Sequence, residues 1–247
     1  MHKTVSIVTV TYNSEETLGA TMESVLGQTC TEIEYLIVDG ASTDGTVAVA
    51  ESYRERMERK GIRLRVLSER DGGIYDAMNK GIRMATGDVI GILNSDDWYE
   101  ADAVETVLGE FEKGGCDLLF SDIRLHRADG SCFVKKARLR RFQTSRDWNH
   151  PTMFVEAQVY KRHPFRNRGI HDDYGCYLQL VREGYRVRTL GKVLANFRMG
   201  GVSNRKSLRE ALGRIRDRYV WCYRANGYSR WYLVECVAIE CVKMVFG

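Results

Sequence analysis

Short apolar runs alternate with helix-like segments along the first half of this chain, and this alternation limits the folds it can adopt. The runs are too short for helices and are rich in residues that favour strands. They cover residues 4–11, 35–38, 64–67, 89–94 and 117–120. Helical patterns follow the first four runs, over about residues 13–28, 42–60, 75–85 and 101–113, the first with a capping-box pattern at Asn13 and Glu16. Strands that alternate with helices predict an α/β fold with a mostly parallel, doubly wound sheet flanked by helices.

Acidic residues follow the predicted strands at what would be one edge of that sheet. They are Asp39, Asp71, Asp96, Asp97 and Asp122. Each alone has an ordinary explanation as a turn residue, and the adjacent pair also fits a cap for a helix that starts near Glu100. Ligands of open α/β sheets bind beyond the carboxyl ends of the strands. Five acids at this edge therefore predict a site that holds a metal ion and the hydroxyls and base of a nucleotide.

Two common phosphate-binding motifs are missing from the sequence. Residues 9–14 read Thr-Val-Thr-Tyr-Asn-Ser, where a dinucleotide-binding protein has a glycine-rich turn, and no P-loop is present. Without such a backbone cradle, a bound metal ion is the expected partner of a diphosphate. This combination predicts an enzyme that uses a sugar nucleotide.

The order of the polar motifs resembles a known family. The motifs cover residues 9–13, 38–46, 71–81, 94–97 and 171–174. In this order they resemble the inverting family 2 glycosyltransferases with the GT-A fold, of the type that builds bacterial surface polysaccharides. The resemblance extends over roughly the first two hundred residues.

The resemblance implies a role for several side chains. The nucleotide would contact Thr11, Tyr12, Asn13, Asp39, Asp71 and Asp96, with Tyr12 near the face of the base and Asp96 at the ribose. Asp97 would bind the divalent metal, either manganese or magnesium. Asp173 would be the catalytic base. The family often has Glu-Asp where this chain has Asp172-Asp173, so either acid is a candidate.

The chemistry of transfer requires such a base. An acceptor hydroxyl is a poor nucleophile, and a carboxylate within hydrogen-bond reach takes its proton as the new glycosidic bond forms. Asp172 and Asp173 open a predicted helix over residues 174–183, whose apolar side chains would anchor it in the core. The alternative is that the two acids only complement the helix dipole.

Two further segments are weaker candidates for contacts with the diphosphate or the acceptor. Arg198 precedes Gly200 and Gly201 in a segment that resembles a loop near the diphosphate, although such an arginine is also common in solvated turns. Paired glycines permit close backbone approach. His150 lies where relatives have acceptor-side residues, although a lone histidine is more often structural.

Charge divides the chain into two unlike halves. Residues 1–123 carry 11 Lys or Arg against 23 Asp or Glu, whereas residues 124–247 carry 26 against 10. We interpret 1–203 as one glycosyltransferase domain, with a nucleotide and metal half (1–123) and an acceptor half (124–203). A basic half suits a phosphorylated acceptor or an anionic membrane surface. No nucleic-acid motif is present, so nucleic acid is not an expected partner.

The remaining residues, 204–247, predict a C-terminal helical extension. Leu208, Leu212, Ile215 and Tyr219 recur at helical spacing, and a second apolar segment covers 231–246. The second segment is too short to span a bilayer. We expect the extension either to contact the membrane peripherally or to pack on the body or across a homodimer.

The seven cysteines are dispersed and lack a C-x-x-C pair, and a charged amino terminus leads straight into a strand. These features predict a cytoplasmic protein without a signal peptide, at the inner face of the cytoplasmic membrane if the extension binds lipid.

The sequence therefore predicts an inverting, metal-dependent glycosyltransferase that moves a hexosyl or N-acetylhexosaminyl group from a nucleotide-diphosphate sugar, with UDP as the favoured nucleotide. The acceptor would be a saccharide or a lipid-linked hydroxyl in cell-surface polysaccharide biosynthesis. Two alternatives are a sugar-phosphate nucleotidylyltransferase and a non-catalytic nucleotide-sugar-binding module. This chain lacks the basic glycine-rich loop that a nucleotidylyltransferase has after its first strand, which disfavours the first alternative. The retention of Asp97 and Asp173 disfavours the second.

Overall fold

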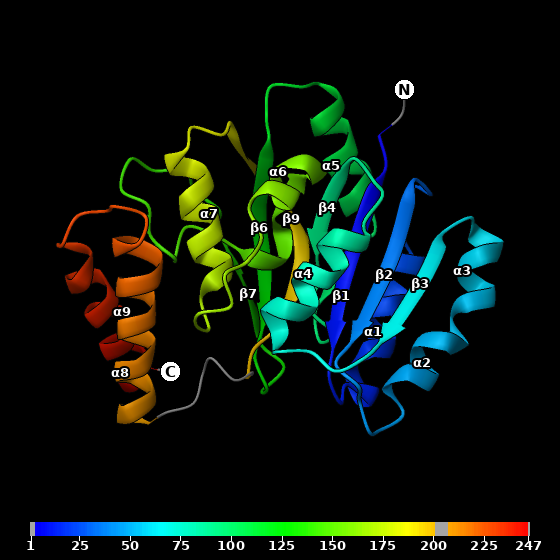
Figure 1. Ribbon diagram of the computed structural model, residues 1–247, viewed down its shortest axis with the longest axis horizontal. Helices are drawn as coiled ribbons and strands as arrows, with labels where there is room; N and C mark the ends of the chain where they lie inside the picture. The colour runs from blue at the N-terminus through cyan, green and yellow to red at the C-terminus, as the bar shows by residue number, and fades with distance from the viewer. Residues whose placement is uncertain (1–2, 201–206, 247) are drawn as a thin grey trace.

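The computed structural model describes residues 3–200 and 207–246, and within them the chain forms one mixed sheet covered by helices on both faces (Figure 1). The strands are β1 (Val5–Thr11), β2 (Ile33–Asp39), β3 (Arg63–Ser68), β4 (Val89–Ile92), β5 (Trp98–Tyr99), β6 (Leu118–His126), β7 (Cys132–Lys135), β8 (Phe154–Glu156) and β9 (Val187–Arg198). The α-helices are α1 (Glu15–Leu26), α2 (Thr46–Ser52), α3 (Arg54–Lys60), α4 (Ile74–Met84), α5 (Ala103–Glu112), α6 (Ala157–Arg162), α7 (Asp172–Arg182), α8 (Leu208–Asp217) and α9 (Tyr232–Phe246). Two further helical segments are the 3₁₀ turn η1 (His150–Thr152) and the π-helix η3 (Arg218–Arg224).

The strand order is β3-β2-β1-β4-β8-β6-β9-β5, and β7 pairs with the far end of β6. The first four strands are parallel, as predicted. The three-residue strand β8, which the sequence did not reveal, is inserted antiparallel between β4 and β6. Because β8 reverses direction on both sides, β6 and β9 run parallel to β4, and the sheet is mostly parallel.

Burial on both faces explains why the first strands read as continuous apolar runs. Every residue of β1 and β2 is buried. Alternate side chains of these strands pack against α4, α6 and α7 on one face and against α1 and α5 on the other. The carboxyl ends of the parallel strands lie at the lower edge of the sheet in Figure 1, and Asp39 ends β2 there while Asp71, Asp96 and Asp97 follow β3 and β4.

Three local predictions are wrong. Helix α1 has no capping box: Asn13 adopts φ +50° and its side-chain oxygen instead accepts a hydrogen bond from the Thr43 amide (2.9 Å). Asp96 and Asp97 do not cap a helix near Glu100, because β5 follows them and α5 begins only at Ala103. The helix predicted over 42–60 is two helices, α2 and α3, which meet at Tyr53.

Asp122 falls inside β6 rather than after it, at a shift in the pairing register with β9, and it is buried. The prediction that a strand ends at Asp122 is wrong, because β6 continues past it to His126. Its carboxylate accepts hydrogen bonds from the ammonium of Lys136 (2.7 Å) and the amide of Ala137 (2.8 Å). The protein itself therefore uses the Asp122 carboxylate.

The C-terminal helices α8, η3 and α9 pack beside α7, at the end of the molecule opposite α3 (Figure 1). Glu240 of α9 is buried, and its carboxylate contacts Arg214 (2.8 Å), Arg218 (3.4 Å) and Lys243 (3.8 Å). The extension is thus held together by a buried charge cluster. All seven cysteines are free thiols, as their spacing predicts.

We expect Glu240→Gln to lower the free energy of unfolding by about 3–5 kcal/mol, because it leaves buried arginines without their counter-charge. Urea denaturation of the full chain measures this. Glu55→Gln, which removes one partner of an exposed ion pair with Arg59, is the matched control and should have little effect. An equally small effect at Glu240 would contradict the assignment.

Lys135 of β7 predicts a pH dependence of stability. Its ammonium donates to the carbonyl of Trp148 (2.8 Å), and burial lowers its pKa to about 8. The unfolded chain, with an ordinary lysine pKa near 10.4, therefore binds more protons between about pH 8 and 10. Stability should rise with pH over this window, by up to about 3 kcal/mol. Urea denaturation should show the rise in the wild type and in Lys113→Met, at an exposed lysine, but not in Lys135→Met; parallel curves for all three would refute it.

Candidate active site

Asp39 ends β2 and organises the loop that follows it. Its side chain is fully buried, and its carboxylate accepts hydrogen bonds from the hydroxyls of Thr11 (3.0 Å), Ser42 and Ser68 (2.7 Å) and from the amide of Ser42 (2.9 Å). Burial raises its pKa, but these donors outweigh burial and leave the pKa below its ordinary value. Asp39 is an ionised carboxylate whose acceptor positions are already filled by the protein. The hydroxyl of Thr11 is likewise used inside the protein, because it donates its hydrogen bond to Asp39.

Beside this loop, three residues from separate strand ends lie together. A Cβ built on Gly40 would lie 2.6 Å from the Asp71 carboxylate and 3.4 Å from the ring of Tyr12. Only glycine permits this approach. The Tyr12 ring is 66% exposed, an unusual exposure for a large aromatic side chain. The exposed ring and the neighbouring carboxylate of Asp71 provide a flat apolar face and a hydrogen-bond acceptor, which are the groups that a nucleotide base binds.

Asp96 and Asp97 follow β4, where the sequence predicted them. Asp97 is fully buried. Its carboxylate accepts hydrogen bonds from the backbone amide of Arg198 (3.2 Å) and the side-chain amide of Asn94 (3.5 Å). Asp96 is partly buried. Burial raises the pKa of both acids, and for Asp97 the charge of Asp96 raises it further. Two neighbouring carboxylates in such surroundings lack a full counter-charge.

The same turn carries a third oxygen. The side-chain oxygen of Asn94 is buried and has no hydrogen-bond partner among the described residues. An unpartnered oxygen beside two carboxylates is the hard donor set that Mg²⁺ and Mn²⁺ prefer. Within residues 3–200 and 207–246, however, no three acidic, histidine or cysteine side chains come together to hold a metal alone. The residues present therefore fit a divalent ion that takes its other ligands from a substrate or water.

Arg198 is the last residue of β9 and lies at this turn. Besides its amide contact with Asp97, its guanidinium carbon lies 5.8 Å from the centre of the Trp98 ring. Gly200 adopts φ +127°, which requires glycine. Gly201 lies outside the described residues.

Asp173 lies in the first turn of α7 and faces two aromatic side chains. Its carboxylate accepts a hydrogen bond from the hydroxyl of Tyr75 (3.0 Å), 98 residues earlier, and lies 3.5 Å from Nδ1 of His150. Burial, together with the charge of Asp173, raises the pKa of Tyr75 well above its ordinary value, so the hydroxyl keeps its proton. Burial lowers the pKa of His150, against the opposing effect of Asp173. His150 is therefore neutral near pH 7.

The neighbouring acid, Asp172, has a different environment. It is more buried than Asp173, and its carboxylate accepts a hydrogen bond from the backbone amide of Arg168 (3.0 Å). It thus fixes the loop that precedes α7. Of the two candidates, Asp173 is the acid whose carboxylate retains access to solvent and faces the other site residues.

Hydrogen bonds between α4 and the loop before α7 explain how Asp173 reaches this position. Asn79 and Phe165 exchange two hydrogen bonds (2.8 and 2.9 Å). The side chain of Asn167 donates to the carbonyl of Gly72 (3.1 Å). Since Asp71 and Tyr75 flank Gly72, the same contacts place Asp173 next to the segment that carries Asp71.

The structure thus brings most of the predicted residues to one edge of the sheet. Tyr12, Asp39 and Asp71 lie together, Asp96 and Asp97 lie together with Arg198, and η1, which contains His150, contacts β4, β6 and β9. Asn13 is turned toward Thr43 at the outer side of the loop. His150 lies against Asp173, a contact that the sequence interpretation did not anticipate.

Sequence reasoning missed Tyr75, Asn79 and Asn94 as site residues. The first two lie in the segment 71–81 and Asn94 in the segment 94–97, so the motifs contained them. Nothing in their spacing indicated that their partners would be Asp173, Phe165 and Asp97.

Comparison with known proteins places this arrangement in a family. Residues 6–173 match the model described as glycosyl transferase family 2. The chain belongs to glycosyltransferase family 2. The resemblance seen in the motifs is thereby confirmed, and the matched range ends at Asp173.

Curated members of family 2 share part of this chain. A PGL/p-HBAD biosynthesis glycosyltransferase of Mycobacterium tuberculosis is 38% identical over 122 residues, which are 48% of this chain and 46% of the relative. The chain thus matches about half the length of this relative. TuaG of Bacillus subtilis, whose name refers to teichuronic acid biosynthesis, is 27% identical over 201 residues and 79% of each chain.

Solved structures confirm the GT-A fold. Residues 1–349 of the S. aureus protein TarS in complex with UDP align with a TM-score of 0.63 at 17% identity, over 99% of this chain and 67% of that TarS chain. The mannosyltransferase PcManGT from Pyrobaculum calidifontis, in complex with GDP-Man and Mn²⁺, aligns with a TM-score of 0.67 at 16% identity, over 100% of this chain and 71% of its own. At these identities the likeness concerns the fold.

We expect Tyr75→Phe to slow donor hydrolysis about tenfold, because Asp173 loses one charge-assisted hydrogen bond that fixes its carboxylate. Donor affinity, measured by calorimetry, should stay unchanged. Tyr35→Phe is the matched control, since the Tyr35 hydroxyl bonds Thr9 (3.1 Å) inside the core. If both variants slow the reaction equally, or if Tyr75→Phe acts only on affinity, Tyr75 does not position Asp173.

Proposed function

We propose that this family 2 member is an inverting glycosyltransferase that uses a nucleotide-diphosphate sugar, with UDP as the nucleotide. The observation that carries the proposal is the placement of Asp173 beside the segment of Asp71, at the same sheet edge as Asp96 and Asp97. A surface for the nucleotide base, a candidate metal-binding turn and the solvent-accessible carboxylate of Asp173 then lie along one edge.

In this proposal the nucleotide base lies on the Tyr12 ring, next to Asp71. Asp39 is a positioning residue rather than a direct contact, because its acceptor positions are occupied by Thr11, Ser42 and Ser68. Asp96 lies near the ribose and diphosphate. Asn13 contributes through its hydrogen bond to the loop at Thr43.

Asp97, with Asp96 and the oxygen of Asn94, would hold a manganese or magnesium ion. When bound, the ion supplies positive charge for the departing nucleoside diphosphate. The amide of Arg198 keeps the Asp97 carboxylate in place. The Arg198 side chain, on the same strand end, is available for a phosphate oxygen, and Gly200 allows the backbone to approach.

Asp173 acts as the general base. The acceptor hydroxyl gives its proton to the Asp173 carboxylate while its oxygen bonds to the anomeric carbon, and the bond from that carbon to the diphosphate breaks. Attack opposite the leaving group inverts the anomeric centre. Tyr75 orients the carboxylate through its hydrogen bond, neutral His150 packs against it, and Asp172 holds the start of α7.

The family and the names of its relatives support a saccharide or lipid-linked acceptor in surface polysaccharide biosynthesis. A cytoplasmic location at the inner face of the membrane is part of the proposal. We also propose that residues 1–203 form the glycosyltransferase domain and residues 204–247 an extension of it. In this proposal the protein has no nucleic-acid partner. A nucleotidylyltransferase would release pyrophosphate, and a binding module would show no turnover.

Two variants test the assigned roles. Asp173→Asn should bind UDP-sugar with unchanged affinity but release UDP about a hundredfold to ten-thousandfold more slowly, because the base is lost. Asp97→Asn should lose the metal-dependent part of donor affinity. Calorimetry with Mn²⁺ and a UDP-release assay measure both, and Asp102→Asn, at an exposed ion pair, is the control.

Equal losses of donor affinity in the two variants would contradict the roles. Formation of pyrophosphate from UTP and a sugar 1-phosphate would indicate the nucleotidylyltransferase, and metal-dependent binding of the UDP-sugar without any turnover would indicate the binding module.

A further inference from the structure

Helix α9 differs from an ordinary surface helix, because its inward face holds charged side chains as well as the buried Cys236 and Ile239, while its outward face is apolar. Its charged residues point toward the body: Glu240 is buried, and Glu235 and Lys243 are partly buried. Their partners include Arg214 and Arg218 of the preceding helices. A surface helix normally buries its apolar stripe and exposes its charges.

The outward face of α9 is uncharged throughout residues 232–243. Its exposed residues are Leu233, Val234, Val237, Ala238, Cys241 and Val242. Trp231, which directly precedes the helix, is 82% exposed, and Val234 is 62% exposed. Leu208 and Leu212 of α8 are likewise more than half exposed. We call this set the α8–α9 apolar surface. A soluble protein rarely leaves such a surface without a partner.

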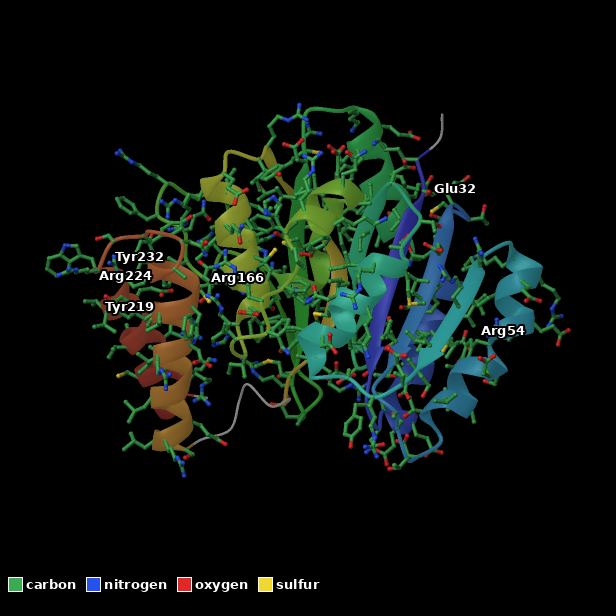
Figure 2. All side chains as sticks on the ribbon, in the orientation of Figure 1. Glu32, Arg54, Arg166, Tyr219, Arg224 and Tyr232 are labelled. Carbon is green, nitrogen blue, oxygen red and sulfur yellow. The ribbon has the colours of Figure 1, made fainter. Side chains whose placement is uncertain are left out.

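The exposed charges around this surface have one sign. Among residues 207–243, the exposed charged side chains are all arginines, namely Arg209, Arg216, Arg224 and Arg230. Figure 2 shows Arg224 and Tyr232 at this end of the molecule and Arg54 of α3 at the opposite end. Glu235 and Glu240, the two glutamates of α9, face the body and do not offset the charge of these arginines at the surface. The surface is therefore apolar and surrounded by positive charge.

This charge pattern selects the partner. A second copy of the same surface would bring arginines against arginines, which is unfavourable in a symmetric interface. An anionic lipid surface offers both an apolar interior for the valines and leucines and phosphate groups for the arginines. Trp231 adds an aromatic side chain of the kind that lies at the headgroup level.

We propose that the α8–α9 apolar surface binds the face of an anionic membrane, with α9 lying in the plane of the interface. Helix α9 has 15 residues, whereas about 20 are needed to cross a bilayer. In the part of the chain that is described, no helix has the length and apolar character of a membrane span. The apolar residues enter the headgroup region, and the arginines contact lipid phosphates.

The surface is mechanically connected to the candidate active site. The guanidinium of Arg218 in η3 lies 3.1 Å from Nε2 of His171, the residue that precedes Asp172 and Asp173. Lipid binding would thus hold α7 beside the membrane, where a lipid-linked acceptor is found. Only this last consequence rests on the proposed function; lipid binding itself does not require sugar transfer.

Sedimentation with vesicles tests the proposal on the full chain. The wild type should bind vesicles of phosphatidylglycerol and phosphatidylcholine and bind pure phosphatidylcholine much more weakly. The variant Val234→Gln/Val237→Gln should bind at least about tenfold more weakly, because it removes apolar area from the outer face. The matched control Val234→Leu/Val237→Leu keeps this area and should bind as the wild type does.

A charge variant tests the contribution of the arginines around the α8–α9 apolar surface. Arg209→Gln/Arg216→Gln/Arg230→Gln should weaken binding by roughly fivefold for each arginine, and high salt should reduce binding of the wild type similarly. Arg59→Gln on α3, at the far end of the molecule, should have no effect. Circular dichroism and UDP release in solution should be unchanged in all variants, which separates lipid binding from folding and from transfer.

Three results would overturn the proposal: equal binding to anionic and neutral vesicles, equal binding by the glutamine and leucine variants, or no binding by the wild type. If light scattering instead shows a dimer that the glutamine variant abolishes, the α8–α9 apolar surface is an interface between copies. Loss of UDP release with intact vesicle binding would refute the proposed function and leave this inference standing.

Discussion

Burial of β1, β2 and β4 on both faces is the constraint from which the rest of the molecule follows. Most side chains in these strands are apolar, and polar ones inside them, such as Ser6, Thr9 and Glu34, are hydrogen-bonded within the protein. Asp71, Asp96 and Asp97 instead lie beyond the strand ends. Parallel direction then collects those ends at one edge. The acids after β2, β3 and β4 are near one another for this reason, although they are tens of residues apart in the sequence.

Within that edge, structural and chemical roles are divided between similar side chains. Asp39 and Asp172 are acids whose carboxylates are used by the protein itself, for the loop after β2 and the start of α7. Asp71 and Asp173 also accept backbone amides, from Gly73 (2.8 Å) and Tyr174 (2.8 Å), but their carboxylates lie beside Gly40 and the Tyr75 hydroxyl at the site. The surroundings of each carboxylate separate the two kinds, which the residue type alone does not.

The alternation of short apolar runs and helices was sufficient to predict the α/β class, the parallel core and the position of Asp96 and Asp97 after β4. It could not predict β8, because three residues carry no periodicity. It ended the fifth strand too early at Asp122, since β6 continues through that residue to His126. The contacts of Asp173 with Tyr75 and His150 also lay beyond it, because they depend on how α4, η1 and α7 pack. The apolar character of 231–246 was visible in the sequence, but which side of α9 faces the body depends on Arg214 and Arg218, in the preceding helices.

The central claim is that the acids after β3 and β4 and the acid that opens α7 serve one bound donor. A crystal structure of the protein with UDP and Mn²⁺ tests it most directly. We expect uracil to lie against the Tyr12 ring and Asp71 and the ion to bind at Asp96 and Asp97. The Asp173 carboxylate should face the space beyond the β-phosphate. Nucleotide bound elsewhere, or an ion held away from the turn after β4, would contradict it.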